Sequence, residues 1–230
     1  MGQTQKTELS QISSYFLLVS IAFVTCLIVS NIIAVKLIDV SGYILTGAIV
    51  IFPVTYIIGD ILTEVYGYSK ARQVIWLGFI ANSFAVCVFA IVGMLPAAEI
   101  WNDQNAYDAI FGATPRILIA SMAAYLVGEF ANSYVLAKLK ILTHGRFLWI
   151  RTIGSTIVGQ SLDSVIFIFI AFSSILPIES LIMATIVQIT AKSGYEALAT
   201  PITYIVVNWL KNKENLDTFD LDTHFNPFVR

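Results

Sequence analysis

The sequence predicts an all-α polytopic membrane protein with six transmembrane helices and both termini in the cytoplasm. Three observations support this fold class. Of the 230 residues, 57% are hydrophobic and only 12% are charged, whereas a soluble domain is roughly 45–50% apolar and about 25% charged. The apolar residues fall into six runs long enough to cross a bilayer. Most positive charges lie on one side of these runs.

The six runs are each long enough for a hydrocarbon core about 30 Å thick. Residues typical of helix boundaries agree with these runs, because Pro115 precedes the fourth run and Pro177 follows the fifth. The first two runs are separated only by a short turn at 37–42. We expect spans at 15–36, 43–66, 73–95, 116–137, 152–176 and 180–209. They form one transmembrane domain at 15–209, between a cytoplasmic N-terminal segment at 1–14 and a solvated cytoplasmic C-terminal tail at 210–230.

The placement of lysine and arginine predicts the orientation. Only Lys36 and Arg116 fall on one side of a six-helix arrangement, together with an acidic loop. The opposite side carries Lys6, Lys70, Arg72, Lys138, Lys140, Arg146, Arg151, Lys211 and Lys213. The positive-inside rule places that side and both termini in the cytoplasm. The basic loop at 138–151 is interpreted as fixing topology, not as a patch for nucleic acid, so the expected surroundings are the lipid bilayer.

Ionisable residues inside the apolar runs are the most informative feature. Each charge near the bilayer centre costs about 2.5–3.5 kcal/mol, so six facing lipid would cost roughly 15–20 kcal/mol. Spacing places them on shared helix faces, because Asp60 and Glu64 are four residues apart, as are Lys192 and Glu196. We therefore expect a central polar site built from several helices. Its members are Asp60, Glu64, Glu129, Asp163, Lys192 and Glu196, with the polar residues Asn82 and Gln160.

Structural roles stay open for individual residues. Lys192 can pair with an acid on its own helix or with Asp163 across the bundle. Glu64 can be an interfacial carboxylate beside Lys70 and Arg72. Asparagines such as Asn82 can simply join helices by hydrogen bonds, worth about 0.6 kcal/mol each. Five acids and one base cannot all be neutralised by pairing, however, so protons, a cation or a hydrogen-bond-donating ligand must complete the site.

Other residue types narrow the possible chemistry. Cys26 and Cys87 lie in apolar runs and are interpreted as small buried hydrophobes, so no metal or other cofactor is expected. Both histidines lie outside the runs, which leaves none as an intramembrane base or metal ligand. Pro53 and Pro201 are expected to interrupt the second and sixth spans near the buried acids, as in transporter helices that line a cavity.

Four stretches resemble the VUT, or YhhQ-like, family of queuosine-precursor transporters. They are SNIIAVKL (30–37), FPVTYIIGDILTEVYG (52–67), GQSLDSVIFIFIAF (159–172) and TAKSGYEALATPITY (190–204). Together they cover the membrane part of the chain, and their order and spacing fit the family. The resemblance implies a six-helix inner-membrane transporter, not an enzyme. It also implies that the substrate is a 7-deazaguanine, such as 7-cyano-7-deazaguanine, taken into the cytoplasm.

A guanine-like base suits the buried acids. Its adjacent N–H groups can be accepted by one carboxylate in a bidentate pair. Asp163 with Gln160 is the first candidate for this contact, and Glu129 and Glu196 are rivals. Lys192 is expected to hold a carboxylate or to donate to the base carbonyl. Further candidates are Asn82, the aromatic residues Phe52, Tyr56, Phe167 and Tyr195 for stacking on the ring, and Asp60 and Glu64 for ion coupling.

Other function classes are also open. One is the substrate-binding membrane subunit of a multi-subunit vitamin importer, whose ATPase would be separate because this chain has no Walker motif. An intramembrane aspartyl protease would use Asp60 and Asp163 as a dyad, but their sequence contexts do not match that class. A rhomboid-like serine protease would need an intramembrane histidine. A structural scaffold and a homodimer remain further possibilities.

Overall fold

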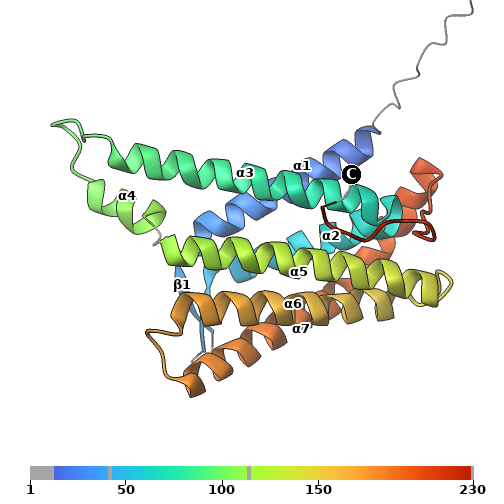
Figure 1. Ribbon diagram of the computed structural model, residues 1–230. Coiled ribbons are helices and arrows are strands. Elements are labelled where there is room, and N and C mark those ends of the chain that lie inside the picture. Colours follow the sequence, from blue (N-terminus) through green and yellow to red (C-terminus); the bar gives the residue numbers. More distant parts are fainter. Residues whose placement is uncertain (1–12, 41–42, 113–114, 229–230) are drawn as a thin grey trace, which may run out of the picture.

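The computed structural model describes residues 13–40, 43–112 and 115–228, which form a bundle of long helices (Figure 1). A small antiparallel hairpin and a 3-10 turn join the first two helices, with Leu37 opposite Thr46. The predominantly helical prediction is confirmed, whereas the hairpin was not expected. The elements are α1 (Ser14–Ile33), β1 (Leu37–Val40), β2 (Tyr43–Thr46), η1 (Gly47–Val50), α2 (Phe52–Tyr66), α3 (Tyr68–Met94), α4 (Gln104–Phe111), α5 (Pro115–Leu142), α6 (Leu148–Phe172) and α7 (Ile178–Glu214).

Four helical stretches among the described residues are long and apolar enough to cross a membrane. They are Ser14–Ile33, Tyr68–Met94, Leu148–Phe172 and Gln104–Leu142, of which the last contains α4, α5 and residues 113–114 outside the described part. Of the other two expected spans, α2 has only 15 residues, fewer than the roughly 20 that a spanning helix needs. The last helix, α7, has 37 residues but carries Lys192 and Glu196 in its interior. The chain is thus a multi-pass membrane protein, and the count of six spans stays a prediction.

The second expected span, 43–66, is wrong in its first part. Residues 43–46 form β2 and residues 47–50 form η1, so helix α2 begins only at Phe52. Pro53 lies in the first turn of α2 and does not interrupt a longer helix. A proline is well tolerated there, because the first N–H groups of a helix have no partner within the helix.

Close backbone contacts position two further segments. A Cβ added to Gly47 would stand 2.7 Å from the carbonyl oxygen of Ile33, so glycine lets the hairpin connection fold against the end of α1. Pro201 lies inside α7, but the expected interruption of the sixth span is wrong, because α7 continues as a helix on both sides of it. Since proline has no N–H, it removes one intrahelical hydrogen bond there.

Two glycines bring α5 and α6 together. A Cβ on Gly128 would stand 2.9 Å from the Cβ of Asp163, and a Cβ on Gly159 would stand 2.8 Å from the Cβ of Asn132. The Tyr56 side chain of α2 lies over the same crossing, with its hydroxyl oxygen 2.7 Å from the Cβ position at Gly128. The crossing therefore gathers polar residues from three helices at one point.

The apolar core is formed mainly by α1, α2, α3 and α7 around Phe23, Leu62, Val65 and Val207. Large apolar side chains also face outward along the helices, for example Phe84 and Leu198 among many others. Such a surface suits lipid contact. Cys87 lies on it, so the expectation that both cysteines are buried is wrong, since Cys87 is exposed and Cys26 is half-buried.

Candidate functional site

A pocket with a buried ion pair in its wall lies between α1, β2, η1, α2, α5, α6 and α7, and we call it the polar pocket. Its volume is about 90 Å³, and its wall combines hydrogen-bonding side chains with aromatic rings. Asp163 of α6 and Lys192 of α7 form an ion pair on this wall, with 2.7 Å between Oδ2 and Nζ. The other polar and aromatic lining residues that matter here are Asn31, Ser121, Gln188, Phe52, Tyr125 and Phe167.

The Asp163–Lys192 pair is buried but still faces the pocket. Asp163 is 5% exposed and Lys192 is 9% exposed. The Lys192 ammonium also lies 4.3 Å from the ring centroid of Phe52, a cation–π contact. Of the two expected pairings of Lys192, the structure therefore has the one across the bundle. Burying such a pair costs desolvation energy, so it is poor evidence for a purely stabilising role.

A larger, mostly apolar pocket of about 480 Å³ adjoins the polar one. Residues Asn31, Ser121, Phe167 and Gln188 are among those that line both, so the two pockets share part of their wall. Asn82 lines the larger pocket, where its Oδ1 accepts a hydrogen bond of 2.8 Å from the Asn31 amide. Together the pockets have the size and the mixed character of a small-molecule site.

Most of the other predicted site residues lie behind the pocket wall. Asp60, Glu129 and Glu196 are each at most 1% exposed, and we call these three the acidic cluster. Gln160 and Tyr56 are also fully buried and line neither pocket. The structure thus separates the expected single site into a pocket with Asp163 and Lys192 and a buried layer behind it.

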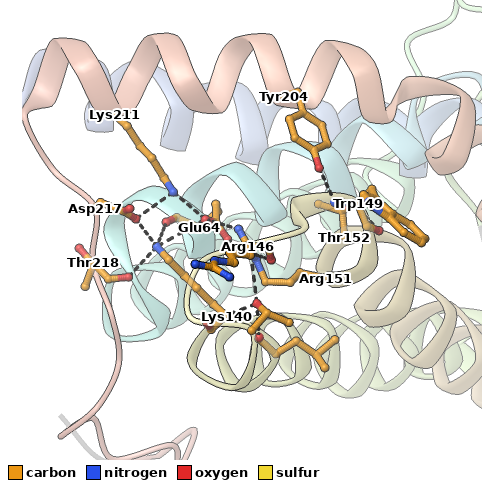
Figure 2. Close-up of polar contacts among 12 residues, drawn as sticks. Glu64, Lys140, Arg146, Trp149, Arg151, Thr152, Tyr204, Lys211, Asp217 and Thr218 are labelled. Atoms are coloured by element: carbon orange, nitrogen blue, oxygen red, sulfur yellow. Dashed lines mark hydrogen bonds and ion pairs between the residues drawn. The ribbon is translucent and has the colours of Figure 1, made fainter.

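Glu64 lies in a separate group of buried charges (Figure 2). Its carboxylate accepts two hydrogen bonds from the Arg151 guanidinium, at 2.8 and 3.1 Å, and one from Lys211 at 2.7 Å. Lys140 lies 3.5 Å from the same carboxylate, and both lysines also pair with Asp217. We call these five residues the Glu64 cluster. The expected neighbours Lys70 and Arg72 do not take part in these ion pairs.

The C-terminal tail, residues 215–228, packs against the bundle where α2 meets α3 (Figure 1). The backbone N–H of Tyr68 donates to both carboxylate oxygens of Asp220, at 3.0 and 3.1 Å. Arg72 donates to the carbonyl oxygens of His224 and Asn226. Apart from residues 229–230, which lie outside the described part, most residues of the tail are exposed, as predicted, but Asp220 is buried and anchors the tail to the bundle. We call this side of the bundle the tail end.

Asp220 acts as a cap for α3. Replacing Asp220 by Ala is expected to lower the free energy of unfolding by about 0.5–2 kcal/mol, since it removes the acceptor for a helix N-terminal N–H. Thermal unfolding in detergent measures the effect. The matched control is Asp222→Ala, because Asp222 is exposed two residues further on. Equal melting temperatures for the two variants would contradict the capping role.

Asp217 gives the tail contact a pH dependence. Burial raises the pKa of Asp217, but hydrogen bonds from Lys140 and Lys211 outweigh it, and the pKa lies below its ordinary value. Its stabilising contribution is therefore complete above the ordinary pKa of about 3.9 and is lost as the pH falls through the lowered pKa. We expect the difference in melting temperature between wild type and Asp217→Asn to be constant near neutral pH and to shrink below about pH 4. A difference that stays constant down to about pH 2 would refute this.

Gln188 precedes Lys192 by four residues, so helical spacing predicts that they share one face of α7, and both line the polar pocket. Other site residues were not among those predicted. The partners of Glu64 had no such signal, because Lys140, Arg151 and Lys211 were interpreted only as topology-fixing charges. Of the predicted aromatic residues, Phe52 and Phe167 line the polar pocket, whereas Tyr195 is 38% exposed and lines neither pocket.

Comparison with known proteins connects this arrangement to a family of transporters. A family model described as "Putative vitamin uptake transporter" matches residues 46–206. The chain is 30% identical to "Probable queuosine precursor transporter" of Bacillus subtilis (strain 168), over 86% of each chain. It is 25% identical to "Queuosine precursor transporter" of Escherichia coli (strain K12), over 62% of each chain. No solved structure matches the chain.

Proposed function

Because this chain belongs to the vitamin uptake transporter family, we propose that it is a transporter that imports queuosine precursors into the cytoplasm. The proposed substrates are 7-deazaguanines such as 7-cyano-7-deazaguanine, and the proposed location is the inner (cytoplasmic) membrane. The names of the relatives in Bacillus subtilis and Escherichia coli support the substrate class. Four helical stretches long and apolar enough to cross a membrane support a multi-pass location.

The observation that carries the proposal is the Asp163–Lys192 pair on the wall of the polar pocket. The Asp163 carboxylate can accept the adjacent N–H groups of a guanine-like base, as such groups favour a bidentate acceptor. Lys192 can donate to the base carbonyl. Phe52 and Phe167 offer aromatic faces for the flat ring. The adjoining pocket, with Asn82, gives the base a mostly apolar entrance.

The other predicted site residues take different roles in this proposal. Gln160, Glu129, Glu196 and Tyr56 lie behind the wall, so we assign them no contact with the substrate. We retain Asp60 as an ion-coupling residue, because its carboxylate has no cationic partner among the described residues. For Glu64 we propose a structural role instead, since three cations surround its carboxylate.

Helix direction indicates how the site is oriented. The residues of these three helices that line the polar pocket lie in the C-terminal half of α6 and in the N-terminal halves of α5 and α7. The cations of the Glu64 cluster lie at the opposite ends of the same helices, with Arg151 near the N-terminus of α6 and Lys140 and Lys211 near the C-termini of α5 and α7. Since the positive-inside rule places the tail end in the cytoplasm, the pocket belongs to the outer half. The Glu64 cluster and the tail then close the cytoplasmic side.

The purified chain in proteoliposomes tests this function. We expect saturable uptake of labelled 7-cyano-7-deazaguanine without ATP or any other protein, and competition by the unlabelled compound. Uptake that requires an added ATPase would favour the multi-subunit importer. If only unrelated vitamins competed for uptake, the proposed substrate class would be wrong. If there were no uptake and the protein cleaved a helical peptide, the intramembrane protease would be favoured.

A further inference from the structure

The acidic cluster is a concentration of buried carboxyl groups without cations. Asp60 lies on α2, Glu129 on α5 and Glu196 on α7. Within the described part of the chain, five of their six carboxylate oxygens have no hydrogen-bond partner. The sixth, Oδ1 of Asp60, accepts a hydrogen bond of 2.7 Å from Asn132. An isolated buried carboxylate is very costly, so such groups bind a proton and become neutral.

The neighbouring charges do not remove this cost. Asp60 experiences the charges of Glu196, Glu129 and Glu64, and Glu129 experiences those of Asp163 and Glu196. The nearby cations are already engaged, because Lys192 pairs with Asp163. In the Glu64 cluster, Lys140, Arg151 and Lys211 pair with Glu64. Asp60, Glu129 and Glu196 therefore face mainly other acids.

A second observation is that a neutral hydrogen-bonding group beside the cluster is also unpartnered. The Tyr56 hydroxyl is fully buried and has no partner among the described residues. It interacts electrostatically with Asp163, Glu129 and Asp60. The hydroxyl oxygen stands 2.7 Å from the Cβ position at Gly128, the neighbour of Glu129. It can exchange hydrogen bonds with a carboxyl group in either protonation state, because a hydroxyl both donates and accepts.

The cluster also interacts electrostatically with an acid of the polar pocket and with Glu64. Glu129 faces Asp163 of the polar pocket, and Asp60 faces Glu64 near the tail end. The Glu129 carboxylate lies against α2, since a Cβ on Gly59 would stand 3.1 Å from its Oε2. A series of acids thus runs from the pocket through Glu129, Glu196 and Asp60 to the Glu64 cluster.

We propose that Asp60, Glu129 and Glu196 form a proton-binding site that couples substrate import to proton entry. A proton reaches a carboxylate of the cluster from the pocket side and leaves it on the tail side, so that no other bond forms or breaks. The proposal rests on the proposed function of the polar pocket in substrate import.

The test uses the full chain in proteoliposomes with a pH-sensitive dye inside and the membrane potential clamped. At equal pH, exchange of labelled for unlabelled 7-cyano-7-deazaguanine measures substrate binding and movement alone. With an acidic exterior, we expect substrate accumulation and acidification of the interior. For one coupled proton, accumulation can reach about tenfold per pH unit.

The variants Glu129→Gln and Asp60→Asn, which imitate protonated acids, are expected to keep exchange but lose the response to the pH gradient. Glu196→Gln serves as a further variant should one of them fail to give a monodisperse protein. The matched control is Glu179→Gln, an exposed acid at the start of α7, which should respond like wild type.

The possible failures are distinguishable. Absence of exchange in wild type would overturn the proposed function. Wild-type exchange without any effect of the pH gradient would overturn the proton site alone, as would accumulation driven only by a sodium gradient. Loss of exchange in both monodisperse variants would also overturn it, because those acids would then be needed for substrate movement itself.

Discussion

Replacing Asp163 by Asn is expected to abolish uptake of 7-cyano-7-deazaguanine at low concentration and to weaken its apparent affinity about 100-fold or more. An amide offers only one acceptor, so the adjacent N–H groups of a guanine-like base meet a donor in place of the second acceptor. Each charge-assisted hydrogen bond contributes about 1.5–3 kcal/mol, and about 3 kcal/mol corresponds to more than 100-fold in affinity. Initial uptake rates over a range of concentrations in proteoliposomes give the change.

A purely structural role of Asp163 predicts a different result. The substitution leaves Lys192 buried without its partner, and the double variant Asp163→Asn/Lys192→Gln removes this unpaired charge. If the pair only stabilises the fold, the double variant recovers uptake. We expect the double variant to fold at least as well as the single one and still to lack uptake. Wild-type affinity in Asp163→Asn would exclude Asp163 from the substrate site.

Replacing Glu64 by Gln is expected to cause the largest loss of stability among the substitutions considered. Arg151 and Lys140 are each 1% exposed, and Glu64 is the acid between them. Removing one partner of a buried ion pair typically costs about 3–5 kcal/mol, because a charge is left buried without compensation. Asp217 pairs with the two lysines but not with Arg151. Loss of the monodisperse peak on heating in detergent measures this effect.

The two lysines at the end of α7 provide a matched control. Lys211 pairs with Glu64 and Asp217, whereas Lys213, two residues further on, is exposed. Lys211→Gln is therefore expected to lower the melting temperature measurably, although less than Glu64→Gln because Lys211 is partly exposed. Lys213→Gln is expected to have no effect. A Glu64→Gln protein as stable as Lys213→Gln would show that the cluster does not hold the tail end together.

The second expected span contains a part of the fold that could not be predicted from the sequence. The apolar run at 43–66 has the length of a transmembrane helix, and nothing in its hydropathy separates strand β2 and turn η1 from helix α2. The local signal was Pro53, which favours the first turn of a helix, whereas the tight fit of Gly47 against Ile33 is visible only in the structure. Hydropathy measures only the preference for lipid, so it cannot distinguish an apolar hairpin from an apolar helix.

The sequence by itself determined the membrane class, the family, and the set of acids that must avoid lipid, because composition, residue order and charge cost do not depend on packing. Helical spacing also placed Asp60 and Glu64 on one face of α2. Only the tertiary structure decided that Glu64 meets Arg151, Lys140 and Lys211 while Asp60 meets other acids. The spacing within one helix fixes which residues share a face, but the partner of that face depends on the rotation and depth of the neighbouring helices. Here Gly128 and Gly159 let α5 and α6 pack closely, and this packing sets the rotation and depth at which Asp163 and Asn132 lie.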